Sequence, residues 1–172
     1  AYEIPLRLVG SEMCIRDRFY GVWDLYEWSV IKPDGNKTLP FSGNVKGYLM
    51  YHQEGWMTAT LMEEGRANTS NDRMRLAKLR NLLLSESKIS IEDENLKDLK
   101  DYFLAANGYI SYGGKFRVDE FNVYHEIETS LLPQWINTTL IRAHKFNENG
   151  DTLTLSAEQD GFVDQLIWKL KD

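Results

Sequence analysis

The sequence predicts a mainly β protein, folded as one antiparallel up-and-down barrel of about 8–10 strands with a two-helix insertion near residues 73–106. Aromatic residues make up 12% of the chain, with five Trp and nine Tyr, and large flat side chains suit the space between strands. Short segments of alternating polarity are separated by turns rich in Gly, Asn and Asp, which is typical of a meander. With 172 residues, there is room for one domain with a substantial core.

The strands are expected to follow one another along the chain with only short turns between most of them. The first, at 20–31, places Trp23 and Leu25 on one face and Trp28 on the other, because side chains alternate along a strand. The others are expected at 45–51, 56–62, 109–118, 121–130, 138–146, 152–158 and 162–170. Closing such a meander into a barrel removes its exposed edges.

The middle of the chain has a helical rather than a strand period. Two apolar stripes recur there with the three- and four-residue spacing of an amphipathic helix. The first stripe comprises Met74, Leu76, Leu79, Leu83 and Leu84, and the second comprises Leu96, Leu99, Phe103 and Ala106. The second helix is expected to end at Asn107 and Gly108, which are common at helix C-termini. Residues 65–107 are therefore predicted to form an α insertion between strands.

The first eighteen residues, AYEIPLRLVGSEMCIRDR, show neither the apolar period of a helix nor that of a strand. Residues 8–18 resemble the translation of an adapter used in transposon-based sequencing libraries, and residues 1–4 match an upstream stretch of that adapter. We therefore expect 1–18 to be a non-native segment, disordered or loosely docked, and 19–172 to be the native domain. Cys14, the only cysteine, would then be foreign. A cytoplasmic location is favoured, although any native signal peptide would have been lost with the original N-terminus.

An ordered set of motifs along 19–170 resembles a known family. Residues 19–23, FYGVW, resemble the Gly-x-Trp that opens lipocalins. The further motifs are similar to those of the bacterial and fungal lipocalin-like domain proteins, a calycin-type family, and lie at 47–51, 55–57, 112–116, 124–126, 132–135, 142, 153–155 and 168–169. The resemblance implies a barrel closed at one end by Trp23 and an interior that holds a small hydrophobic ligand. The helical insertion departs from that pattern, as does Lys169, where an Arg is common.

Two polar residues are candidates for contact with a ligand. His125 faces the barrel interior if Val123 and Ile127 do, where it would hydrogen-bond a ligand carbonyl or act as an acid or base. The alternative is a structural histidine bonded to a neighbouring strand. Arg142 is a candidate anchor for a ligand carboxylate or enolate, and the alternative is a barrel-end ion pair or a solvated strand residue.

Four aromatic residues are further candidates for lining the pocket: Tyr48, Trp56, Tyr112 and Trp135. Tyr and Trp combine an apolar body with a polar group, which suits oriented binding of a hydrophobic molecule. Ordinary core packing is the alternative for each of them. His52 and His144 are expected at the surface.

Several function classes are disfavoured. The net charge of −6 would repel a phosphate backbone, and no apolar run is long enough to span a bilayer. The three histidines lack metal-ligand spacing. There is no phosphate-cradling glycine loop, dinucleotide fingerprint or nucleophile elbow, so no cofactor is expected.

Three functions remain open. The first is binding of a small hydrophobic molecule in the barrel. The second is a cyclase- or isomerase-type enzyme that acts on a polyene or polyketide-like substrate by positioning it. The third is a protein-interaction module that uses the helical insertion. The oligomeric state does not follow from the sequence.

Overall fold

A computed structural model describes residues 15–66, 68–69, 72–85 and 93–171. The chain divides into two compact units, which are described separately. The barrel unit comprises Ala1–Glu64 and Ile110–Asp172, and the helical unit comprises Gly65–Tyr109.

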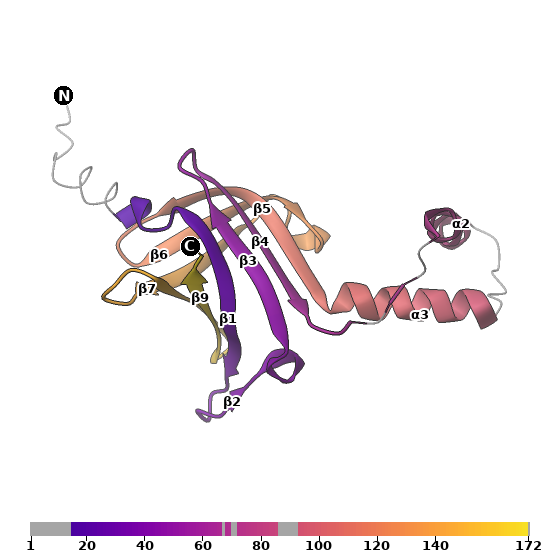
Figure 1. Ribbon diagram of the computed structural model, residues 1–172, viewed down its shortest axis with the longest axis horizontal. Coiled ribbons are helices and arrows are strands. Elements are labelled where there is room, and N and C mark those ends of the chain that lie inside the picture. Colours follow the sequence, from indigo (N-terminus) through magenta and orange to yellow (C-terminus); the bar gives the residue numbers. More distant parts are fainter. Residues whose placement is uncertain (1–14, 67, 70–71, 86–92, 172) are drawn as a thin grey trace. The chain divides into compact units, whose positions relative to one another are not determined.

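The predicted barrel is confirmed (Figure 1). The strands follow the order β2-β1-β3-β4-β5-β6-β7-β8-β9, and β1 also pairs with β9, which closes eight strands into a ring. The short β2 extends the sheet beside β1. The strand bounds are β1 Gly21–Ile31, β2 Lys37–Thr38, β3 Val45–Tyr51, β4 Trp56–Glu63, β5 Tyr109–Val118, β6 Asn122–Ser130, β7 Thr139–Phe146, β8 Thr152–Gln159 and β9 Phe162–Leu170.

Aromatic side chains close one end of the barrel. Trp23 and Phe19 are fully buried, and the indole Nε1–H of Trp23 donates to the Phe19 carbonyl at 2.8 Å. The Phe19 ring packs edge-on against Tyr51 and Phe146, with centroids 5.2 and 5.0 Å apart. The Trp23 ring is therefore buried with its own N–H donor paired to the backbone.

A β-bulge in β1 changes which residues face the core. The pairing with β9 runs Leu25 with Trp168 and then Trp28 with Leu166, with a register shift between Leu25 and Glu27. Directly paired residues share a face, so Trp28 lies on the face of Leu25. The prediction that they lie on opposite faces was therefore wrong, because one extra residue shifts the alternation.

The helical unit confirms the predicted insertion, with α2 at Arg73–Leu84 and α3 at Asp93–Asn107. The Asp72 side chain caps α2 by accepting from the backbone N–H groups of Met74 and Arg75. Arg75 and Asp98 form an ion pair between the helices. Two 3₁₀ turns, η1 at Pro40–Gly43 and η2 at Pro133–Trp135, belong to the barrel unit. Within the described ranges, none of the helices has the length and apolarity needed to cross a membrane.

Residues 15–18 contact the barrel. The chain is helical over 15–17, and Ile15 packs against the core. The Arg18 guanidinium lies 4.3 Å from the centre of the Phe146 ring, and Arg16 Nη2 donates to the Gln53 carbonyl at 3.3 Å. The rest of the adapter-like segment, residues 1–14, lies outside the described residues.

Candidate functional site

The inner face of β6 carries one polar side chain among apolar ones. Val123 and His125 are fully buried and Ile127 is nearly so, which is the alternation of a strand whose odd-numbered residues point inward. The neighbouring strands continue this layer, since His125 pairs with Phe116 of β5 and with Leu140 of β7. The imidazole therefore stands in the barrel interior.

Two tyrosines from two other strands contact the imidazole of His125. The hydroxyl of Tyr51, on β3, lies 2.7 Å from Nε2, and the hydroxyl of Tyr112, on β5, lies 3.4 Å from Nδ1. A neutral imidazole has one N–H donor and one acceptor nitrogen. Each ring nitrogen of His125 therefore lies beside a tyrosine hydroxyl, which is able either to donate or to accept a hydrogen bond, so both tautomers of the imidazole find partners.

Burial keeps these three groups uncharged. Burial is the larger cause and the positive charge of Arg142 the smaller, and together they lower the pKa of His125 to about 3. Burial also raises the pKa of Tyr112, and raises that of Tyr51 well above its ordinary value. At neutral pH His125 is therefore a neutral hydrogen-bonding group rather than a proton source, and both tyrosines keep their hydroxyl protons.

Arg142 lies on the same inner face, one strand further on. On β7 the even-numbered residues are half-buried and the odd-numbered ones exposed, which turns Arg142 inward with Leu140. Its positive charge partly offsets the rise in the pKa values of Tyr51 and Tyr112 and adds to the fall in the pKa of His125. The charge of Arg142 therefore acts on all three groups.

Arg142 makes a backbone hydrogen bond, but among the described residues it makes no ion pair. Its Nη1 donates to the Ile141 carbonyl at 3.0 Å. Glu27 pairs with Lys37, and Glu126, which is exposed on the other face of β6, pairs with Arg117. In the part of the chain that the structure describes, no carboxylate forms an ion pair with Arg142.

Trp135 completes the group. It ends the 3₁₀ turn η2 between β6 and β7, is half-buried, and packs edge-on against Tyr112 with ring centroids 5.7 Å apart. Four of the six candidate residues, His125, Arg142, Tyr112 and Trp135, are therefore brought into one neighbourhood.

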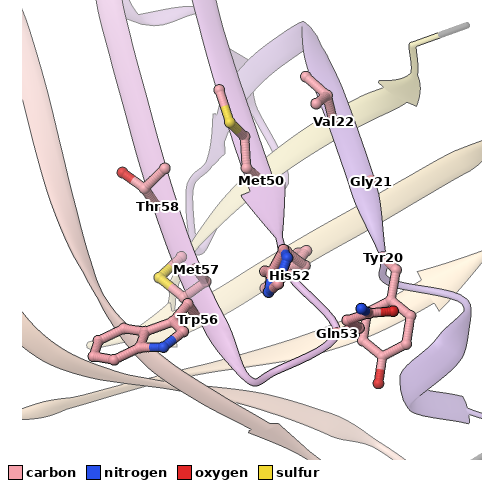
Figure 2. Close-up of a pocket in the computed structure, with 10 residues that line it drawn as sticks. Tyr20, Gly21, Val22, Met50, His52, Gln53, Trp56, Met57 and Thr58 are labelled. Carbon is pink, nitrogen blue, oxygen red and sulfur yellow. The ribbon is translucent and has the colours of Figure 1, made fainter.

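The other two candidates, Tyr48 and Trp56, lie on the outer face. Lys171 Nζ lies 5.0 Å from the centre of the Tyr48 ring, and Lys115 Nζ lies 3.2 Å from the centre of the exposed Trp56 ring. Trp56 borders an open groove of about 740 Å³ across β1, β3 and β4 (Figure 2). The groove is lined by Tyr20, Gly21, Val22, Met50, Tyr51, His52, Gln53, Trp56, Met57 and Thr58.

Sequence reasoning missed Tyr51 and misplaced His144. Tyr51 follows Leu49 at the two-residue spacing of one strand face, and both are buried, so the period of β3 carried the signal. His144 was expected at the surface, but it is half-buried. Its ring packs edge-on against Phe19 at 5.1 Å, and its Nε2 lies 3.1 Å from the Asp119 carbonyl oxygen.

Comparison with known proteins gives one family match. A sequence profile described as a lipocalin-like domain matches residues 20–169. Among solved structures, a redesigned β-barrel is similar, with a TM-score of 0.37 and 9% sequence identity, over 91% of this chain and 94% of that one. No curated protein matches the chain.

Proposed function

The chain belongs to the lipocalin-like domain family, and on that premise we propose that its barrel binds one small hydrophobic molecule that carries an acceptor group. The observation that carries the proposal is Arg142, an inward-facing and half-buried cation without a carboxylate partner among the described residues. A half-buried cation without an opposite charge beside it opposes folding, and a ligand anion or carbonyl would offset that cost.

The tyrosines and His125 supply a second donor. In one tautomer, Tyr51 donates to Nε2 of His125, and the Nδ1–H donates to the Tyr112 oxygen. The hydroxyl hydrogen of Tyr112 is then free to donate to a ligand. The short 2.7 Å distance at Nε2 supports this direction, because a hydroxyl donor makes shorter hydrogen bonds than an N–H donor.

These donors favour one chemical class of ligand. Arg142 and Tyr112 both donate, so the ligand head would be a carboxylate, an enolate or a carbonyl oxygen. Leu140 and Trp135 flank them with apolar surface, which suits an aliphatic or conjugated body. A pocket with a few convergent polar groups in an apolar lining orients such a molecule.

Calorimetry with matched ligands tests the head group. Dodecanoate and dodecanol have the same chain and differ in charge, and dodecanoate is expected to bind more tightly. Arg142→Met should weaken dodecanoate at least about tenfold, which corresponds to 1.4 kcal/mol, and should leave dodecanol nearly unchanged. Lys145→Met is the control, because Lys145 lies on the exposed face of the same strand. Equal affinity of the two ligands, or equal effects of the two variants, would contradict the proposal.

A second comparison separates the barrel interior from the outer groove. Tyr112→Phe removes the inner hydroxyl and keeps the ring, whereas Trp56→Ala removes a wall of the groove. Weaker dodecanoate binding in Tyr112→Phe alone supports the inner site. Loss of binding in Trp56→Ala alone would place the ligand outside the barrel and overturn the assignment.

An enzyme is the second candidate function, favoured by the same donors. The neutral Tyr112 hydroxyl and the Arg142 guanidinium, if both donated to one ligand oxygen, would polarise a carbonyl and stabilise the enolate formed from it. Chromatography with mass spectrometry of a bound polyene ketone before and after incubation separates the two functions. Recovery of an isomer from the wild type but not from Arg142→Met supports catalysis, and recovery of unchanged ligand supports binding alone.

A further inference from the structure

The helical unit leaves much of its apolar surface uncovered. Seven large hydrophobic residues of α2 and α3 are exposed: Met74, Leu83, Leu84, Leu96, Tyr102, Phe103 and Leu104. Leu96 and Phe103 belong to the stripe that the sequence predicts to be the packed face of α3, yet their side chains are 54% and 66% exposed. Burial of α2 is also slight, since Leu79 is its one buried residue.

Some of these residues, together with the half-buried Leu76, have the spacing of a helix-packing surface. Leu96 and Phe103 are seven residues apart, as are Leu76 and Leu83, so each pair lies on one side of its helix, two turns apart. Between the helices lies an apolar hollow of about 440 Å³. It is lined by Leu76, Ala77, Leu79, Arg80, Leu83, Leu84, Asp98, Leu99 and Tyr102. Within the helical unit, the described residues supply no third helix that would cover this surface.

The two helices differ in charge. In the sequence of α2 there are four basic residues, Arg73, Arg75, Lys78 and Arg80, and no acidic one. In that of α3 there are four acidic residues and two basic ones. Two copies of α2 would therefore repel each other, whereas α2 attracts α3, as the ion pair between Arg75 and Asp98 already shows within one chain.

We propose that the helical unit pairs with the helical unit of a second copy of this chain, with α2 of each copy against α3 of the other. A twofold axis makes both contacts equivalent, and each joins the basic helix to the acidic one. Four helices would then enclose the apolar residues of both copies, as in a four-helix bundle.

The apolar area available is of the size that a dimer needs. Seven large side chains, each about half exposed, present on the order of 500–700 Å² per copy in all, and those on the facing sides of the two helices contribute part of it. A standard interface buries roughly 800 Å² per partner, and the charged residues around the apolar stripe supply the remainder. The proposal concerns the helical unit alone and is independent of what the barrel binds.

Sedimentation equilibrium of the full chain tests the proposal between about 1 and 200 µM, the range in which a weak to moderate dimer dissociates. The mass should rise from that of one chain to that of two. Phe103→Glu should keep the mass of one chain throughout, since Glu is a good helix former and places a charge in the interface. Phe121→Glu is the matched control, because Phe121 is 67% exposed on the barrel unit, and it should dimerise like the wild type.

A charge variant tests the arrangement of the helices. Lys78→Glu together with Arg80→Glu reverses exposed charges of α2 and should weaken the dimer at least about tenfold at low salt, with a smaller effect at 1 M salt, where charges are screened. A wild type that stays monomeric at all concentrations overturns the proposal. A Phe103→Glu variant that still dimerises overturns it too, because the contact would then lie elsewhere. Far-UV circular dichroism shows that the helices of each variant are intact.

Discussion

The hydroxyl of Tyr51 lies 2.7 Å from Nε2 of His125, and both side chains are buried in the barrel. They come from β3 and β6, which are separated in the sheet by β4 and β5, so this hydrogen bond crosses the barrel interior between strands that do not pair. A buried polar pair of this kind stabilises only if both members stay partnered. That condition makes the pair sensitive to single substitutions and to pH.

Tyr51→Phe should destabilise the protein although it removes only one oxygen. The substitution leaves Nε2 of His125 buried without its partner, which costs about 1–3 kcal/mol. For a protein of this size, each kcal/mol corresponds to a loss of roughly 2–4 °C in Tm. Thermal unfolding followed by circular dichroism measures the change. Tyr26→Phe is the control, because Tyr26 is exposed, and its Tm should match that of the wild type.

Stability should fall as the pH drops below about 6.5, the ordinary pKa of histidine. His125 has a pKa of about 3 in the folded state. Between about pH 6.5 and pH 3, the unfolded chain therefore takes up a proton that the folded chain does not. The free energy of unfolding should therefore decrease with falling pH, by up to about 1.4 kcal/mol per pH unit. At pH values above 6.5 this contribution is fully present.

Urea unfolding between about pH 4.5 and 6.5 isolates the histidine. Hydrogen bonds to Asp34, Asp119 and Asp151 hold the pKa values of these carboxyls below 3.8, so their contribution is lost only at lower pH. His125→Gln should flatten the slope in this window. An equal slope in His125→Gln and the wild type would show that His125 is protonated in the folded state.

The fold was largely predictable because strand period and turn composition are local signals. The eight long strands lie within about two residues of their predicted bounds, and the two helices fall where the apolar spacing changes. The bulge at Leu25 and Glu27 was not predictable, because an extra residue in a strand depends on its partner and leaves the composition unchanged. For that reason, the prediction of the face on which Trp28 lies was wrong.

The candidate site was predictable only in part. The alternation around His125 placed it inward, since Val123 and Ile127 set the phase of β6. The partners of His125 were not predictable, because Tyr51 reaches it from a strand 74 residues away in sequence and Tyr112 reaches it across a register shift in the β5–β6 pairing. Tyr48 and Trp56 were selected by residue type, but a strand places neighbouring side chains on opposite faces, and these two lie outside.

Gly114→Ala should severely destabilise the barrel. A Cβ at this position would lie 2.0 Å from the Glu126 carbonyl oxygen and 2.9 Å from the Glu128 backbone nitrogen, at a register shift between β5 and β6. Backbone atoms of a paired strand yield little, so we expect a loss of about 3 kcal/mol or more. Gly35→Ala meets nothing within 4 Å and should cost about 1–2 kcal/mol for its left-handed backbone. Chemical denaturation of both variants compares the two, and equal losses would contradict the predicted clash.

Arg142→Met should leave the ligand-free protein as stable as the wild type or more stable. No ion pair is broken among the described residues, and an apolar side chain replaces a half-buried charge whose desolvation opposes folding. A residue retained for ligand binding commonly costs stability in this way. Differential scanning calorimetry without ligand should therefore show an equal or higher Tm for Arg142→Met. Dodecanoate should raise the Tm of the wild type by mass action and should raise that of Arg142→Met less. A Tm for the ligand-free variant that falls by several degrees would show that Arg142 supports the fold, and the anchoring role would then lose its basis.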